Sequence, residues 1–227
     1  ARALVWRGID PSRTGFPGPK GRGATKPFSC TFDCFVEAAL DARVMLIRHR
    51  DGSGATVGND SFRLRDWIVD GHPELGPPTL EDIEYHLTTL FFEVRPRGFL
   101  EIRGADALPT RYRSALVAFF CGLIYDDQAR RESVERLRRV EGGTEELARL
   151  GLEESYSSSE YSQLTKDVWK LALEGASRLP ASFLREEDLR SAENFFERFP
   201  SQGRAPLDEL VTELDRSPAD ALAWARE

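Results

Sequence analysis

The stretch from residue 93 to residue 106 reads Glu93-Val94-Arg95-Pro96-Arg97-Gly98-Phe99-Leu100-Glu101-Ile102-Arg103-Gly104-Ala105-Asp106. From residue 99 to residue 103 apolar and charged residues alternate, which is typical of a β-strand whose side chains point to two opposite faces. The two expected faces are Leu100 with Ile102, and Arg97 with Phe99, Glu101 and Arg103. The pattern predicts a buried strand with one charged face, which serves either solvent-exposed ion pairs or a polar ligand.

Signals on both sides of this strand predict an α+β fold. Before it, Thr79 with Asp82 three residues later resembles a capping box, and the helix that it starts should run to about Leu90. Other elements are expected further upstream: a strand at 2–10, a loop rich in glycine, proline and lysine to about 26, a helix at 30–40, a strand at 43–48, a turn at 51–54 and a helix at 61–69. After the strand, 112–125 predicts a buried helix, and the chain from 128 should be helical with breaks at 142–143, 157–159 and 201–203.

Composition narrows the class of protein. The 227 residues are 41% hydrophobic and 30% charged, which is ordinary for a globular protein, and no apolar run approaches the roughly 20 residues that span a bilayer, so no membrane association is expected. The three cysteines lack the spacing of a zinc site, and a reduced cytoplasmic location is the default. The chain begins abruptly in strand-like sequence without a methionine, so we expect it to be the later part of a longer protein.

The charge is distributed unevenly. Residues 1–140 hold 21 Lys and Arg against 19 Asp and Glu, whereas residues 141–227 hold 10 against 19. Because the basic residues are interleaved with acidic ones, no stripe for nucleic acid is expected. The more positive part contains the charged strand, which favours a small anionic ligand over a polymer.

The arginines are the first candidate site residues. Arg95, Arg97 and Arg103 lie within nine residues, and Arg13 lies in a turn next to glycine. Guanidinium groups bind carboxylates and phosphates through two parallel hydrogen bonds, so the group suits a carboxylated or phosphorylated ligand. Cross-strand ion pairs on an exposed face explain the same residues, and the spacing does not decide between the two. Glu101 would be either an oxygen ligand for Mg²⁺ or, more commonly, an ion-pair partner of Arg103 or Arg97.

Other polar residues carry weaker expectations. His86 could act as a base, although a histidine on a helix surface or at a helix cap is more common. Asp10 and Asp106 follow strands, where a carboxylate usually caps a turn. The loop at 15–23 lacks the Gly-Lys-Ser/Thr spacing of a phosphate-binding loop, and its prolines remove backbone donors.

Two motifs together are more specific than these arguments. They are Trp6-x-x-x-Asp10-x-x-Arg13-Thr14-Gly15 and His86-Leu87-Thr88-Thr89-Leu90-Phe91-x-Glu93-Val94-Arg95-x-x-x-x-Leu100-Glu101-x-Arg103-Gly104-Ala105-Asp106. The sequence resembles glutamate–cysteine ligase of the plant and proteobacterial type, and the related ligase of actinobacterial ergothioneine synthesis. The likeness spans nearly the whole chain.

The resemblance implies an ATP-dependent ligase that joins the γ-carboxylate of glutamate to the amine of cysteine through γ-glutamyl phosphate, for glutathione or related thiol synthesis. It also implies a glutamine-synthetase-like curved antiparallel sheet, present here in part over residues 1–127, with a helical C-terminal lobe of the same domain over 128–227. ATP and Mg²⁺ are the implied cofactors.

The resemblance also assigns roles. Glu101 would bind Mg²⁺, and Arg103 would stabilise the transferring phosphoryl group as a catalytic and nucleotide-binding residue. Arg13 would hold the carboxylate of glutamate, and Arg95 and Arg97 would also bind substrate.

Family members carry roughly as many residues again before the segment that begins at Trp6, including other metal-binding carboxylates. This chain would therefore supply part of an active site and need the missing N-terminal half as its partner. Two alternatives stay open: a ligase with a different acceptor amine, and a truncated fragment or subunit without catalytic activity.

Overall fold

The computed structural model describes residues 5–6, 8–16, 32–58, 61–140 and 143–226. The chain divides into two compact units, Ala1–Asp106 and Ala107–Glu227. The first unit mixes helices with short strands, and the described part of the second contains helices without strands, so the chain is α+β. The division lies before the predicted boundary at 127, because the helix predicted at 112–125 packs against later helices of the second unit.

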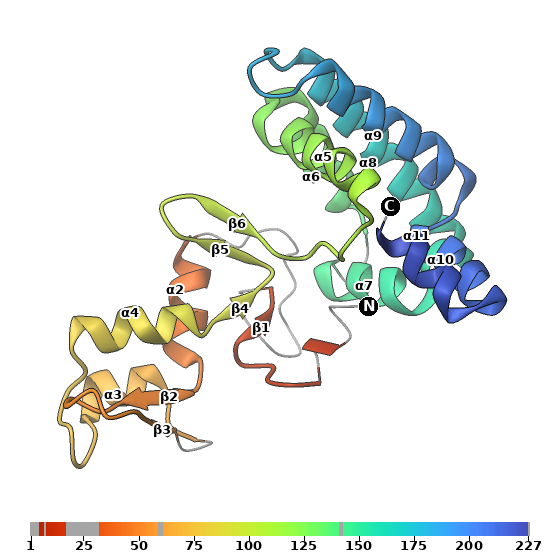
Figure 1. Ribbon diagram of the computed structural model, residues 1–227. Helices are drawn as coiled ribbons and strands as arrows, with labels where there is room; N and C mark the ends of the chain where they lie inside the picture. Colours follow the sequence, from red (N-terminus) through yellow and green to blue (C-terminus); the bar gives the residue numbers. More distant parts are fainter. Residues whose placement is uncertain (1–4, 7, 17–31, 59–60, 141–142, 227) are drawn as a thin grey trace. The chain divides into compact units, whose positions relative to one another are not determined.

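The described strands of the first unit form three separate pairs (Figure 1). One pair is parallel and joins β1 (Thr14–Gly15) to β4 (Phe91–Phe92), and two are antiparallel, joining β2 (Leu46–Arg48) to β3 (Ala55–Val57) and β5 (Val94–Pro96) to β6 (Leu100–Ile102). These pairs do not show the single curved antiparallel sheet that the resemblance implies.

The alternating stretch forms the β5–β6 hairpin. Gly98 lies at the turn with a φ of 76°, a conformation that side chains with a Cβ rarely adopt. The main-chain N–H of Arg97 donates to the carbonyl oxygen of Phe99 at 2.8 Å and closes the turn. The predicted strand is confirmed only over Leu100–Ile102, because Arg97 to Phe99 form the turn. Its predicted burial is wrong: Phe99 and Leu100 are 67% and 61% exposed. A two-stranded hairpin leaves its turn and one face open unless another layer covers them.

The strand predicted at 2–10 is also wrong for the part that the structure describes, residues 5–6 and 8–10. Val5 and Trp6 are helical, and Gly8 and Ile9 form a turn in which their N–H groups donate to the carbonyls of Val5 and Trp6. The Trp6 ring stacks on Phe91 with the ring centroids 5.0 Å apart. Most of the loop at 15–23 and Cys30 of the predicted helix lie outside the described residues.

Three helices complete the first unit, close to the predicted positions: α2 (Phe32–Asp41), α3 (Leu64–Asp70) and α4 (Leu80–Thr88). The predicted capping box is confirmed, since the Thr79 hydroxyl accepts from the N–H of Asp82 and the Asp82 carboxylate accepts from the N–H of Thr79. Two small apolar clusters support these helices: Val44, Ile47, Leu64 and Trp67, and Ala39, Ala42, Leu90 and Phe92.

The second unit is a helical assembly around an aromatic core. Tyr112, Trp169, Phe195 and Phe199 pack there with ring centroids 5.0 to 5.4 Å apart. Its elements are η1 (Thr110–Tyr112), α5 (Arg113–Tyr125), α6 (Asp127–Leu137), α7 (Gly143–Arg149), η2 (Leu150–Glu154), η3 (Ser155–Ser157), α8 (Ser159–Arg178), α9 (Glu186–Arg198), η4 (Pro200–Gln202), α10 (Pro206–Arg216) and α11 (Pro218–Arg226). None of the described helices pairs sufficient length with sufficient apolar character to cross a bilayer.

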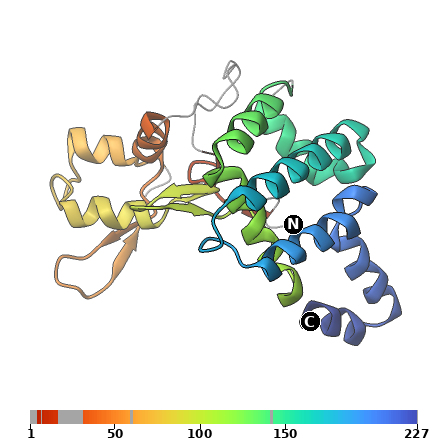
Figure 2. The same cartoon turned by 90° about the horizontal axis from the view of Figure 1, so that it is seen from above.

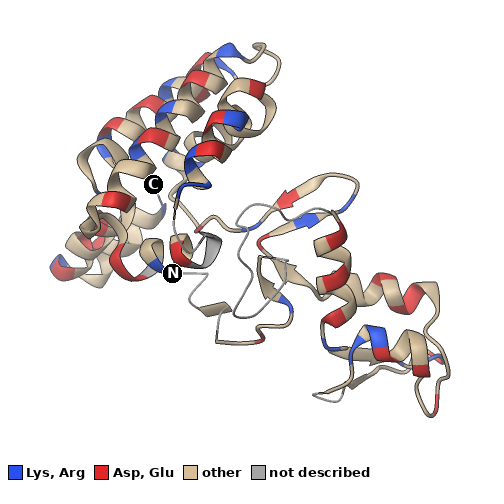
Figure 3. Cartoon of the chain, turned by 180° about the vertical axis from the view of Figure 1, so that it is seen from behind, with Lys and Arg blue, Asp and Glu red and all other residues tan. Residues whose placement is uncertain are grey.

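Helices α5 and α8 pack side by side (Figure 2), and two glycines, Gly122 and Gly175, lie where their backbones approach each other. A Cβ on Gly122 would overlap the carbonyl oxygen of Ala172 and lie 2.7 Å from the nitrogen of Ala176. The surfaces of the helices carry acidic and basic residues side by side, as Figure 3 shows, which agrees with the interleaved charge of the sequence.

Candidate functional site

The β5–β6 hairpin brings three of the predicted site residues together. Arg95 and Glu101 lie directly opposite each other in the antiparallel register. The Nε and Nη2 atoms of Arg95 donate to Oε2 of Glu101 at 3.0 and 2.6 Å, and Nη1 of Arg103 donates to Oε1 at 3.2 Å. Each oxygen of the Glu101 carboxylate thus has its own arginine. We call Arg95, Glu101 and Arg103 the hairpin cluster.

Arg95 is buried, at 6% exposure. Its Nη1 atom donates to the carbonyl oxygens of Leu90 at 2.8 Å and Thr88 at 3.3 Å. These carbonyls lie at the end of α4, where a helix leaves carbonyl groups without partners and concentrates partial negative charge. All three nitrogens of the guanidinium are therefore engaged with protein acceptors.

Arg103 is less fully engaged. Its guanidinium lies over the ring of Phe91 with the Cζ atom 5.5 Å from the centroid, and its side chain is 21% exposed. The Nε atom is buried and has no hydrogen-bond partner among the described residues. A buried donor without an acceptor is rare in proteins and calls for an explanation, such as a bound water, ion or ligand. Arg97 is half exposed, and its Nη1 atom is 4.0 Å from Oε2 of Glu101.

The three arginines keep Glu101 ionised. Hydrogen bonds from Arg95 lower the pKa of the Glu101 carboxyl most, and the charges of Arg95, Arg103 and Arg97 lower it further. The side chain is 29% exposed, so the carboxylate is reachable from solvent. The described residues contain no group of three or more His, Cys, Asp and Glu that could enclose a metal ion. A single carboxylate still fits Mg²⁺, because this ion is commonly held by one or two carboxylates together with substrate phosphates and water.

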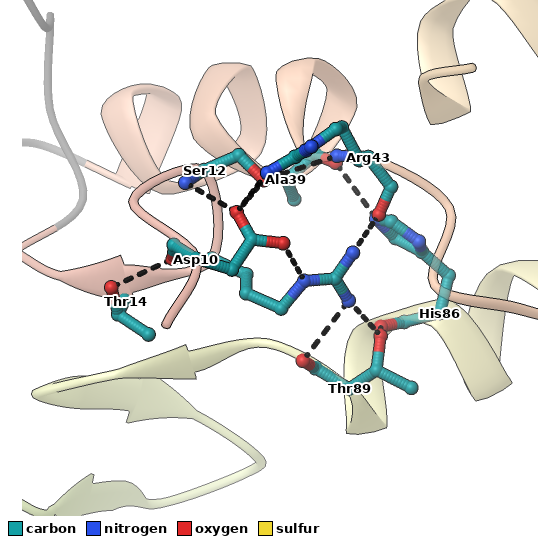
Figure 4. A network of polar contacts seen from close by, with 8 residues as sticks. Asp10, Ser12, Thr14, Ala39, Arg43, His86 and Thr89 are labelled. Atoms are coloured by element: carbon teal, nitrogen blue, oxygen red, sulfur yellow. Dashed lines mark hydrogen bonds and ion pairs between the residues drawn. The ribbon is translucent and has the colours of Figure 1, made fainter. Parts of the chain in front are cut away.

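Arg13 lies in a second network. Its neighbours Asp10, Arg43 and Thr89 are labelled in Figure 4. Arg13 is 3% exposed, and its Nε atom donates to Oδ2 of Asp10 at 2.8 Å. Its Nη1 atom donates to Oγ1 of Thr89 at 3.0 Å, and its Nη2 atom donates to the carbonyl oxygen of Arg43. We call this set, together with His86, the Arg13 network. The guanidinium ties three parts of the first unit together: the turn at 10–13, the start of the segment before β2, and the end of α4.

Asp10 is held as a carboxylate by its neighbours. Partial burial alone would raise the pKa of Asp10, but hydrogen bonds from Ser12, Arg13 and Arg43 hold it well below its usual range. Oδ1 accepts from both the N–H and the hydroxyl of Ser12, at 2.9 and 2.7 Å, which is the turn-capping role that the sequence predicts for this aspartate.

His86 is buried at 2% exposure, which differs from the surface or capping position expected for it. Its Nε2 atom lies 3.0 Å from the carbonyl oxygen of Ala39 and therefore donates to it, while Nδ1 is buried without a partner among the described residues. Desolvation lowers the pKa of His86 to about 4, and the charge of Arg13 contributes in the same direction. The ring is neutral near pH 7.

The two networks meet at the end of α4. Arg95 donates to the carbonyls of Thr88 and Leu90, and Arg13 donates to the hydroxyl of the residue between them, Thr89. Arg43 and Thr89 were not predicted as members of either site. Their contacts with Arg13 span 30 and 76 residues, and nothing in the local sequence of either residue indicates such a partner.

Comparison with known proteins places the chain in a family. The chain belongs to glutamate-cysteine ligase family 2 (GCS2), whose model matches residues 1–212. This confirms the resemblance found in the two motifs.

Individual relatives agree. The chain is 29% identical over 233 residues to glutamate–cysteine ligase A, chloroplastic, of Oryza sativa subsp. indica, 30% identical over 233 residues to the chloroplastic glutamate–cysteine ligase of Brassica juncea, and 29% identical over 233 residues to that of Arabidopsis thaliana. These alignments cover 94% of this chain in each case, and 45%, 43% and 42% of the respective relatives. The chain thus spans less than half the length of the curated relatives that it matches.

Proposed function

We propose that this chain takes part in the ATP-dependent ligation of the γ-carboxylate of L-glutamate to the amine of L-cysteine, giving γ-glutamylcysteine for glutathione or related thiol synthesis. Family membership over residues 1–212 supports the reaction class. The structural observation that carries the proposal is the partly exposed ion pair of Arg103 with the ionised carboxylate of Glu101, in which Nη1 and Oε1 are 3.2 Å apart. A cation and a carboxylate side by side, both reachable, suit a phosphate group and its metal ion.

The residues of the hairpin cluster would have separate tasks. Bound Mg²⁺ would supply positive charge to the nucleotide phosphates, with Glu101 as one of its protein ligands. Arg103 would donate to the γ-phosphoryl group as negative charge develops on its oxygens during transfer to glutamate. Transfer forms the bond from the γ-carboxylate oxygen to phosphorus and releases ADP. The amine of cysteine then attacks the acyl carbon of γ-glutamyl phosphate and expels inorganic phosphate.

The proposed substrate-binding arginines differ in how well the geometry supports them. Arg97 is half exposed and keeps its guanidinium available for a carboxylate. Arg13 has less support, because its nitrogens donate to Asp10, Thr89 and Arg43. In the proposed ligase Arg13 would bind the carboxylate of glutamate only if it exchanges one of these acceptors. The same proposal includes a curved antiparallel sheet, an N-terminal segment of the same enzyme as partner, and a cytoplasmic location.

The test is an assay of a complete ligase, in which this chain is joined to the N-terminal segment of a protein of the same family. Release of inorganic phosphate from ATP should require both glutamate and cysteine, and γ-glutamylcysteine should be detected by mass spectrometry. Turnover with another amine and not with cysteine would show that the acceptor is that amine. If the folded protein shows no turnover with any tested amine, the proposed activity is wrong and the alternative without catalytic activity is favoured.

A further inference from the structure

Arg95 is placed differently from a residue that binds substrate. Its guanidinium makes four hydrogen bonds: Nε and Nη2 each donate to one oxygen of Glu101, and Nη1 donates to the carbonyls of Leu90 and Thr88. The side chain is 7% exposed. A ligand that accepted from Arg95 would have to displace the carboxylate of Glu101 from a charged hydrogen bond of 2.6 Å.

We infer that Arg95 is a positioning residue, which holds Oε2 of Glu101 so that Oε1 is turned toward Arg103 and the proposed metal ion. This inference rests on the proposed function and replaces the substrate-binding role expected for Arg95. Its basis is the division of the Glu101 carboxylate between two arginines, with Oε2 taken by buried Arg95 and Oε1 by partly exposed Arg103. Substitution of a residue that orients a metal ligand in this way typically lowers metal affinity or activity by about 10- to 100-fold.

The anchor of Arg95 makes the orientation rigid. Because Nη1 is fixed to two carbonyls at the end of α4, the guanidinium cannot follow Glu101 if the carboxylate rotates. The register of the hairpin adds a second constraint, since Arg95 and Glu101 lie opposite each other on adjacent strands. The position of Oε1 is therefore determined by α4 as well as by the strand that carries Glu101.

The experiment uses the ligase that contains this chain, with Mn²⁺ as a paramagnetic substitute for Mg²⁺ and a non-hydrolysable ATP analogue. Electron paramagnetic resonance measures bound Mn²⁺ without any turnover. Arg95→Met should weaken Mn²⁺ binding in the presence of the analogue by about tenfold or more. The KM for glutamate should be unchanged. Arg65→Met is the matched control, because Arg65 also contacts two carboxylates, of Glu37 and Asp41, but on an exposed surface.

The outcomes separate the possibilities. A raised KM for glutamate with unchanged Mn²⁺ binding would overturn the inference and return Arg95 to substrate binding. An unchanged KM for glutamate together with unchanged Mn²⁺ binding would overturn the inference in favour of a purely structural role for Arg95. Absence of Mn²⁺–nucleotide binding in the unsubstituted ligase would overturn the proposed site itself. If Arg95→Met does not fold, Arg95→Lys keeps the cation and should weaken Mn²⁺ binding by a smaller factor, while an unchanged affinity in that variant would overturn the inference.

Discussion

The Nε2 atom of His86 donates to the carbonyl oxygen of Ala39, 47 residues earlier in the chain, at 3.0 Å. This bond joins α4 to α2 inside the first unit. Burial, and not this bond, favours the neutral ring, and a proton added to Nδ1 would have no acceptor among the described residues. The stability of the unit should therefore depend on pH in part through this histidine.

The pH dependence follows from the lowered pKa. Between the ordinary value of 6.5 and about 4, the unfolded chain binds the proton more strongly than the folded chain. The contribution of His86 to the free energy of unfolding should be complete above pH 6.5 and fall as the pH drops toward 4, by about 3 kcal/mol at most. Chemical denaturation between pH 7 and pH 4.5 should show a smaller slope for His86→Gln than for the unsubstituted chain. Exposed His49→Gln is the control, and equal slopes in all three would contradict the prediction.

The cap of α4 gives a second prediction. The Thr79 hydroxyl accepts from the N–H of Asp82 and donates to its carboxylate at 2.6 Å, and Arg50 donates to the same hydroxyl at 3.0 Å. Thr79→Ala should lower the free energy of unfolding by about 1 kcal/mol, since it leaves an N–H at the helix start without its partner. Thr88→Ala, at the exposed other end of α4, should cost less than about 0.5 kcal/mol. Equal losses would show that the capping box does not stabilise α4.

The close approach of α5 and α8 gives a third. Gly122→Ala should destabilise the second unit by about 3 kcal/mol, because the added methyl group would meet backbone atoms of Ala172 and Ala176 that cannot move independently. Gly8→Ala is the control, since a Cβ there would have no neighbour nearer than 3.7 Å. Thermal unfolding followed by circular dichroism measures both. A Gly122→Ala variant as stable as the control would mean that the two helices can separate at little cost.

The role of Arg103 can be tested by activity. In the complete ligase Arg103→Met should lower kcat by about 10³-fold, the effect expected when an arginine that stabilises a transferring phosphoryl group is lost. The free energy of unfolding should change by less than about 1 kcal/mol, because the ion pair with Glu101 is partly exposed. Arg65→Met should keep full activity. If Arg103→Met instead unfolds enough of the protein to account for the lost activity, Arg103 has a structural role.

Local signals in the sequence predicted local structure well. The Thr79–Asp82 capping box and the alternation around Glu101 each depend on residues close in the chain, and both were found. The buried position of His86 and the contacts of Arg13 with Thr89 and Arg43 could not be predicted, because these partners lie 30 to 76 residues away. In the described part of the strand expected at 2–10, the prediction failed for a related reason: Trp6 lies in a helical turn and stacks on Phe91, which is 85 residues later in the chain.

The candidate site was predicted in its residues and only partly in its geometry. The sequence left open whether Glu101 pairs with Arg103 or Arg97, and the structure adds Arg95 as the partner with the shortest contact. Pairing across a hairpin depends on its register, which the turn at Gly98 determines. Alternation along one strand does not contain that information.

Helix α4 is fixed at both ends, by the capping box at Thr79 and by the two arginines that bind the segment from Thr88 to Leu90. Inserting one residue between these ends would turn the helix end by about 100° and advance it by about 1.5 Å. The carbonyls that hold Arg95 would then point elsewhere. Related chains should therefore keep the number of residues from Thr79 to Leu90 constant, whereas the exposed turn between β2 and β3 is free to lengthen or shorten.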